Sequence, residues 1–155
     1  MVDQLPLDAP EAPRPRFRTL NLLVGRMTTI KLSYWAALTA WELWGPRGWS
    51  IPFAMVASVS AMAWAAWSAR RVDARAGAIA RSIPTVATAF VTASVVAAPA
   101  SLPLLLVERQ RSIEGCVSQL TCNPTALYLW VAVFAIGFLV IPAVFALALR
   151  RGSPA

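Results

Sequence analysis

Both cysteines of the chain lie in one short stretch, IEGCVSQLTC, as Cys116 and Cys122. Two thiols at this C-x5-C spacing can form a disulfide, take part in thiol exchange or contribute to a metal site. Zinc prefers four ligands, and the chain offers no third cysteine and no histidine, so a metal site is not expected. We expect a structural disulfide between Cys116 and Cys122. Two free thiols, or a bond to another subunit, are the alternatives.

Glu42 is the acidic residue that falls inside an apolar segment, LSYWAALTAWELWG. An ionisable side chain within a membrane is by default a functional-site hypothesis, here a carrier of a proton or a cation. The alternative places Glu42 at the membrane interface beside Trp41 and Trp44, paired with Arg47. Because Glu42 lies close to the end of its segment, the pattern favours the interfacial interpretation, and we expect no charge at the membrane centre.

The chain contains no histidine. This removes the commonest general base, the commonest protein metal ligand and the usual axial ligand of a haem. Catalytic triads built on histidine are excluded, and no glycine-rich phosphate-binding loop is present. The sequence therefore predicts a protein that is not an enzyme and that binds no metal and no cofactor.

The composition is typical of a membrane protein, with 58% hydrophobic and 14% charged residues. A soluble domain has about 45–50% apolar and about 25% charged residues. The net charge of +7 could indicate nucleic-acid binding. However, the arginines flank apolar segments, where membrane topology explains them. We expect the lipid bilayer and other membrane protein subunits as partners, and no nucleic acid.

The apolar segments predict an all-α integral membrane protein with four transmembrane helices, at about 28–44, 51–68, 83–107 and 126–149. A span needs about 20 residues, so the first is long enough only if it starts near Thr28. Lys31 would then extend along the helix to the lipid headgroups. Pro99 and Pro103 are expected to kink the third span.

The segments around the spans have distinct compositions. Residues 1–16 form a proline-rich polar tail that we expect to be extended. Apolar residues recur at helical spacing over 17–30, which predicts an interfacial amphipathic segment or simply the inner end of the first span. Residues 108–125, with both cysteines, are expected to form an extracytoplasmic loop. Residues 150–155 form a basic C-terminal tail.

The basic residues predict the orientation of a four-span protein. With four spans, both termini lie on one side together with eleven basic residues, and the other side has Arg47, Arg109 and Arg111. The positive-inside rule places the richer side in the cytoplasm. The prediction is a multi-pass protein of the bacterial cytoplasmic (plasma) membrane, with both termini cytoplasmic and the cysteines outside, where disulfides persist.

Small residues recur at every fourth position of the third predicted span, at Thr85, Ala89, Ala93, Ala97 and Ser101. The second span has a similar stripe at Ala57, Ala61 and Ala65. Such stripes allow helix backbones to approach closely in a membrane. We expect Ala89, Ala93, Ala97 and Ser101 to be helix-packing positions within this chain.

Four predicted helices with a glutamate in the first resemble the small multidrug resistance transporters, in which that glutamate is essential. The resemblance implies an oligomeric transporter in which Glu42 binds the coupling ion. In that family the glutamate lies near mid-membrane, whereas Glu42 lies near a helix end, and this chain is longer. Four-helix thiol oxidases also combine such helices with cysteines, but they use a C-x-x-C pair beside a quinone and a second pair, which this chain lacks.

Taken together, these features predict a small non-catalytic accessory or assembly subunit of a larger bacterial membrane complex. We expect a respiratory-chain or cell-envelope complex, by analogy with other such subunits. The alternative is a small oligomeric transporter or channel that uses Glu42 as the ion-coupling carboxylate.

Overall fold

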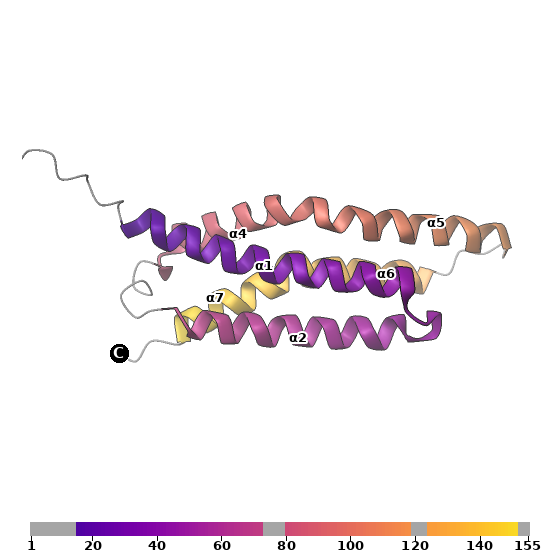
Figure 1. Cartoon of the computed structure of the whole chain (residues 1–155), viewed down its shortest axis with the longest axis horizontal. Coiled ribbons are helices and arrows are strands. Elements are labelled where there is room, and N and C mark those ends of the chain that lie inside the picture. Colours follow the sequence, from indigo (N-terminus) through magenta and orange to yellow (C-terminus); the bar gives the residue numbers. More distant parts are fainter. Residues whose placement is uncertain (1–14, 73–79, 119–123, 152–155) are drawn as a thin grey trace, which may run out of the picture.

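The structure, a computed structural model, describes residues 15–72, 80–118 and 124–151. Within these ranges, the side chains of residues 15, 16, 47, 111–118 and 124–127 are not described. The described chain is all-helical and its helices lie side by side in an elongated bundle (Figure 1). The main helices are α1 (Pro15–Trp44), α2 (Ser50–Arg70), α4 (Ile83–Ala97), α5 (Leu102–Ser118), α6 (Pro124–Ala135) and α7 (Ile141–Arg151).

Three continuous helical stretches are long and apolar enough to cross a membrane, namely Ser50–Arg70, Ile83–Gln110 and Tyr128–Arg151. They correspond to the predicted spans at 51–68, 83–107 and 126–149. The all-α prediction is therefore confirmed, together with the prediction of three apolar helices of spanning length. Helix α1 is not among the three, and it carries Arg18, Arg26, Lys31 and Glu42 among its apolar residues.

Helix α1 is continuous over 30 residues. The separate interfacial segment predicted over 17–30 is not distinguished in the structure, because these residues run directly into the predicted first span. The helix begins at Pro15, a residue suited to the first helical turn, and ends at Trp44, just before Gly45, a poor helix former, and Pro46, which lacks a backbone N–H. No proline interrupts it between these points.

The α-helical pattern of the third helical stretch is interrupted at a proline. Between α4 and α5 the backbone tightens into a 3-10 turn, η2 (Ala98–Ser101), which contains Pro99. Proline lacks the backbone N–H that an α-helix needs and clashes with the preceding turn. The Ser101 hydroxyl donates a hydrogen bond of 2.7 Å to the Ala98 carbonyl and stabilises the turn.

The segment 108–125, predicted as an extracytoplasmic loop, is helical over most of its described part, because α5 continues to Ser118 and α6 begins at Pro124. Hydropathy marks where an apolar stretch ends, which here is Val107. It does not mark where a helix ends, since Glu, Arg and Gln are good helix formers and follow directly. The helix therefore continues past the apolar boundary.

The fourth helical stretch contains a π-helical turn, η3 (Ile136–Val140), between α6 and α7. Pro142 follows two residues later and cannot donate the hydrogen bond that would close an α-helical turn. A π-helical segment inside an α-helix, as here, is typically a single turn. The turn also brings the buried residue Gly137 against α1.

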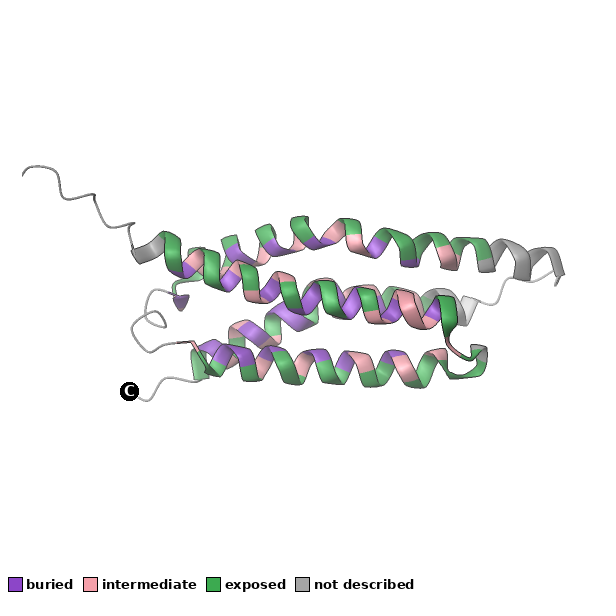
Figure 2. Ribbon diagram, viewed as in Figure 1, coloured by how far each residue is buried: buried purple, intermediate pink, exposed green. Residues whose placement is uncertain are grey.

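Helix α1 lies between the other helices and supplies much of the core (Figure 2). It packs against α4 and α5 on one side and against α2 on another, while α2 packs along α7. Its buried residues recur at helical spacing: Thr19, Leu23, Met27, Ile30, Lys31, Tyr34, Trp35, Leu38 and Glu42. The bundle is thus built around a helix that carries several charged residues.

Candidate functional site

The predicted disulfide falls outside the described residues. Cys122 lies in the segment 119–123, and Cys116 belongs to α5 but its side chain is not described. The bond between them remains a prediction. Among the described residues, no group of histidine, cysteine or acidic side chains could hold a metal ion.

The small-residue stripe of the third stretch lies on the inner face of the bundle. Ala89, Ala93 and Ala97 are fully buried and Ser101 is nearly so. Helix α4 makes its main contacts with α1, so this stripe faces α1 rather than the second span. Helix α2 likewise buries small residues, among them Ala61 and Ala65. Small side chains thus surround α1, whose own side chains are large.

Lys31 does not extend to the membrane surface as the sequence predicted. Its side chain is completely buried in the middle of α1. The long aliphatic stem does not reach outward because α4 and the π turn pack over it and offer the ammonium group partners inside the bundle.

Three side chains hold the Lys31 ammonium group. It donates a 2.6 Å hydrogen bond to Ser94 Oγ on α4, and the Ser94 hydroxyl in turn donates to the Phe90 carbonyl at 2.8 Å. The ammonium nitrogen also lies 5.2 Å from the ring centroid of Phe90 and 5.5 Å from that of Phe138. Each such cation–π contact is worth about 0.5–2 kcal/mol. The site offsets part of the cost of burying the amine.

Beside Lys31, a narrow crevice runs between α1, α2 and α7. It has an empty volume of about 160 Å³, with no space large enough for a water molecule. Apart from Lys31, its lining is apolar, from Met27, Ile30, Ala65, Ile141, Pro142 and Phe145. This side of the amine therefore offers apolar contacts.

A second buried polar contact lies one turn along α1. The Tyr34 hydroxyl is 3.1 Å from Ser58 Oγ on α2 and donates to the Val133 carbonyl on α6 at 3.3 Å. Ser58 also donates to the Ala54 carbonyl at 2.7 Å. Tyr34 thereby ties three helical stretches together at one depth in the bundle.

An aromatic cluster surrounds Trp35, which is fully buried. Its ring lies 4.9 Å from that of Phe134 and 5.2 Å from those of Phe138 and Tyr34, measured between centroids. The backbone at Gly137 approaches the same indole so closely that a Cβ atom there would overlap it. The cluster fixes the π turn against α1 next to the Lys31 site.

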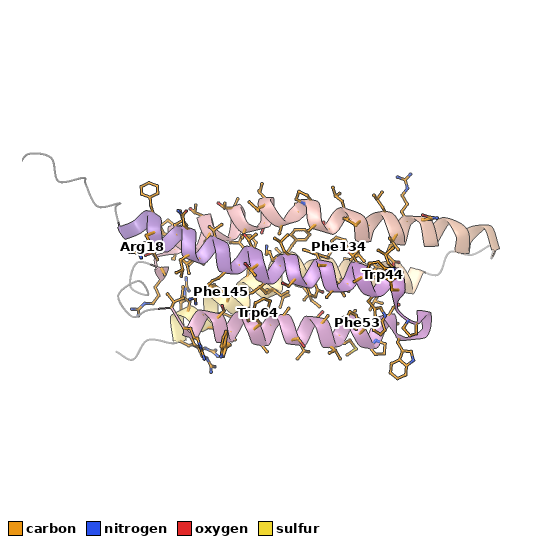
Figure 3. The ribbon with its side chains drawn as sticks, in the orientation of Figure 1. Arg18, Trp44, Phe53, Trp64, Phe134 and Phe145 are labelled. Atoms are coloured by element: carbon orange, nitrogen blue, oxygen red, sulfur yellow. The ribbon has the colours of Figure 1, made fainter. Side chains whose placement is uncertain are left out.

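Glu42 is also buried, with 3% of its surface exposed. It lies on nearly the same face of α1 as Lys31, since eleven residues complete about three helical turns. Of its predicted neighbours, Trp41 stacks on Phe53 with centroids 4.1 Å apart, and Trp44 is largely exposed at the helix end (Figure 3). The predicted pairing with Arg47 concerns a side chain that is not described.

Sequence reasoning missed Lys31 as a site residue. One signal was available: Lys31 is the single lysine beside thirteen arginines, and it falls within the first predicted span. A local sequence pattern could not predict the hydrogen-bond partner of Lys31, because Ser94 lies 63 residues further along the chain. A buried amine of this kind can bind an anion or exchange a proton, and these are the chemical options of the site.

Comparison with known proteins adds no assignment to this arrangement. No protein-family model matches the chain. No curated protein and no solved structure matches it either.

Proposed function

We propose that the chain is a bacterial cytoplasmic-membrane protein in which α1 is a fourth span beside the three apolar stretches. The polar residues Lys31, Tyr34 and Glu42 of α1 face the bundle interior. Its outward positions include Leu22, Leu32 and Leu43, which suit contact with lipid. Neighbouring helices therefore shield the groups that would otherwise be costly in a membrane.

The proposed orientation has both termini in the cytoplasm. The start of α1, the end of α2, the start of α4 and the end of α7 lie at one end of the bundle (Figure 1). Basic residues gather at this end: Arg18, Arg26, Arg70, Arg71, Arg81, Arg150 and Arg151. With Lys31 assigned to the bundle interior, ten basic residues remain on the side of the two termini and three on the opposite side. This difference supports the same orientation.

We further propose that the protein is a small non-catalytic accessory or assembly subunit of a larger membrane complex, of the respiratory-chain or cell-envelope type. The observation that carries this proposal is the length of the third stretch. From Ile83 to Ser118, α4, η2 and α5 extend about 55 Å, against a hydrocarbon core of about 30 Å. The end of α5 extends beyond the other helices and is suited to docking (Figure 1).

Extraction from native membranes in mild detergent tests this proposal. We expect the chain to migrate in a native gel with other membrane proteins, which mass spectrometry of the band identifies. Replacing residues 111–118 by a short Gly-Ser linker, which removes the projecting part of α5 and keeps α6 and α7, should weaken the association, because it removes the proposed docking element. A chain that migrates only as a monomer or homodimer at native expression would contradict the subunit proposal.

A transporter is the second candidate, because two ionisable side chains, Lys31 and Glu42, are buried on one face of α1. In that case Glu42 is the ion-coupling carboxylate. Replacing it by glutamine removes the charge at nearly constant size, so Glu42→Gln should abolish uptake or efflux by vesicles while expression is unchanged. If the protein is an accessory subunit, we expect Glu42→Gln to leave the native complex intact.

A further inference from the structure

Lys31 is a buried cation for which the described side chains supply no carboxylate. Its ammonium group has one hydrogen-bond acceptor among them, Ser94 Oγ, and two aromatic rings. An ammonium group carries three donors. A charge within a membrane is costly and is almost always paired with an opposite charge or with backbone carbonyls. Among the described residues, the Lys31 ammonium group therefore has no carboxylate as a counter-ion.

The described acidic side chains are too far away to fill this place. Glu42 lies eleven residues further along α1, a rise of about 16 Å. Glu108 lies on α5, fourteen residues beyond the Ser94 that holds the amine, a rise of about 21 Å. A salt bridge needs the two groups within about 4 Å. The counter-ion must therefore come from outside this part of the chain.

The depth of Lys31 decides which anions can reach it. Ser94 lies near the middle of the stretch Ile83–Gln110, and Phe138 near the middle of Tyr128–Arg151. The ammonium group between them is therefore near mid-membrane. The headgroup region begins about 15 Å away, half the thickness of the hydrocarbon core. A lipid phosphate is out of reach, whereas a side chain of another transmembrane helix is not.

Above Lys31, α4 and the π turn lie next to each other, and we call the boundary between them the seam. Helices α4 and α5 pack mainly on α1, whereas α7 packs mainly on α2, so α4 and the π turn meet over Lys31 without extensive packing of their own. Ser94, Phe90 and Phe138, the three residues that cover the amine, are each partly exposed. A single layer of side chains thus separates Lys31 from a helix lying in the seam.

We propose that Lys31 is an intramembrane docking site for a carboxylate carried by a transmembrane helix of a partner protein, seated between α4 and the π turn. The charge complementarity of a buried cation without an acidic neighbour selects this partner chemistry. Movement of the Phe90 and Phe138 rings exposes the ammonium group, which then exchanges an aromatic contact for a salt bridge. This inference rests on the proposed function as a subunit and names the chemistry of its partner.

A model helix tests the charge dependence directly. Purified full-length protein is reconstituted in vesicles of phosphatidylcholine and phosphatidylglycerol with a fluorescent peptide of about 20 Leu and Ala residues. One peptide has a central glutamate and its matched control has glutamine. Energy transfer should report about tenfold tighter association of the glutamate peptide, within the range of polar contacts between membrane helices.

Variants assign that preference to Lys31. Lys31→Met keeps the length of the side chain and removes the charge, and it should abolish the preference for glutamate over glutamine. Lys31→Arg should retain it. Tyr34→Phe is the matched control for a loss of core stability, because it removes the hydroxyl that contacts Ser58 and Val133 on the same helix. It should leave the preference unchanged. Equal binding of both peptides to the wild-type protein would overturn the inference.

A crosslinking experiment in native membranes separates this inference from the proposed function. A photoreactive phenylalanine analogue at Phe90, above the amine, should crosslink to a span that contains Asp or Glu. The same analogue at Val59, exposed on α2, should not. A native complex without crosslinks from Phe90 would refute the Lys31 site and leave the subunit proposal standing. Absence of any complex would refute both.

Discussion

Gly137 determines how closely the π turn approaches α1. A Cβ atom at this position would lie 2.8 Å from Trp35 Cη2 and 3.0 Å from Tyr34 Cε1, with the indole Cζ2 closer still. Neither ring has room to retreat, because Trp35 is fully buried and Tyr34 nearly so. The absence of a side chain at Gly137 is therefore a packing requirement rather than a matter of backbone conformation.

We predict that Gly137→Ala destabilises the bundle by about 1–3 kcal/mol, the usual cost of overpacking a core. Thermal unfolding in detergent measures the effect as a lower Tm. Gly25→Ala is the matched control, since Gly25 is exposed in α1 and a Cβ atom there meets nothing within 4 Å. It should raise stability by about 0.5–1 kcal/mol through helix propensity. Equal effects of the two substitutions would contradict the close contact.

At the scale of elements, the contact of α4 with α1 rests on the size of the residues between them. Ala89, Ala93 and Ala97 are fully buried, and they face a helix that carries Lys31 and Trp35. In a membrane such contacts depend on close packing, because lipid is as apolar as the side chains themselves. Small residues on one helix accommodate large residues on the other.

We predict that Ala93→Val weakens this contact by about 1–3 kcal/mol, because two added methyl groups force α4 away from α1. Ala87→Val is the same substitution at an exposed position of the same helix. It should change stability by less than about 0.5 kcal/mol. Unfolding in a denaturing detergent titration compares them, and indistinguishable midpoints would rule out the stripe as a packing surface.

At the scale of the whole molecule, the two ends of the bundle differ in charge. The end that holds Arg18 and the start of α1 is rich in arginine (Figure 3). The opposite end carries Trp44, the turn after α1 and the end of α5. Arg26 and Arg71 make contacts at the basic end, to the Ser68 carbonyl and over the Trp67 ring, and so contribute to packing as well as orientation.

We predict that an impermeant maleimide labels Cys116 and Cys122 in intact spheroplasts after reduction. Cys116 belongs to the end of α5, which lies opposite the arginine-rich end. Without reduction, labelling should be weak if the two thiols form the proposed disulfide. A cysteine introduced at Ser153, in the C-terminal tail, is the control and should react only after lysis. The reverse pattern would invert the proposed orientation.

Much of the fold is predictable because hydropathy and helix-breaking residues act locally. Apolar runs located the helices at 51–68, 83–107 and 126–149, and the 3-10 turn of the third stretch contains Pro99, one of its two prolines that were expected to kink the helix. The same locality explains why hydropathy did not indicate the helix over 108–118, where polar helix formers extend α5 beyond its apolar part. The distribution of arginines predicted that both termini are cytoplasmic, and the maleimide labelling experiment tests this orientation.

The sequence by itself determined that this protein is helical, apolar and arranged as long antiparallel stretches, because those properties follow from residues close together in the chain. Only the tertiary structure decided that the Lys31 side chain is buried. Whether a lysine extends to the headgroups or stays inside depends on what packs over its stem, and here Phe90, Ser94 and Phe138 do so from distant helices. Burial is a property of the assembled bundle, because neighbours far along the chain create it.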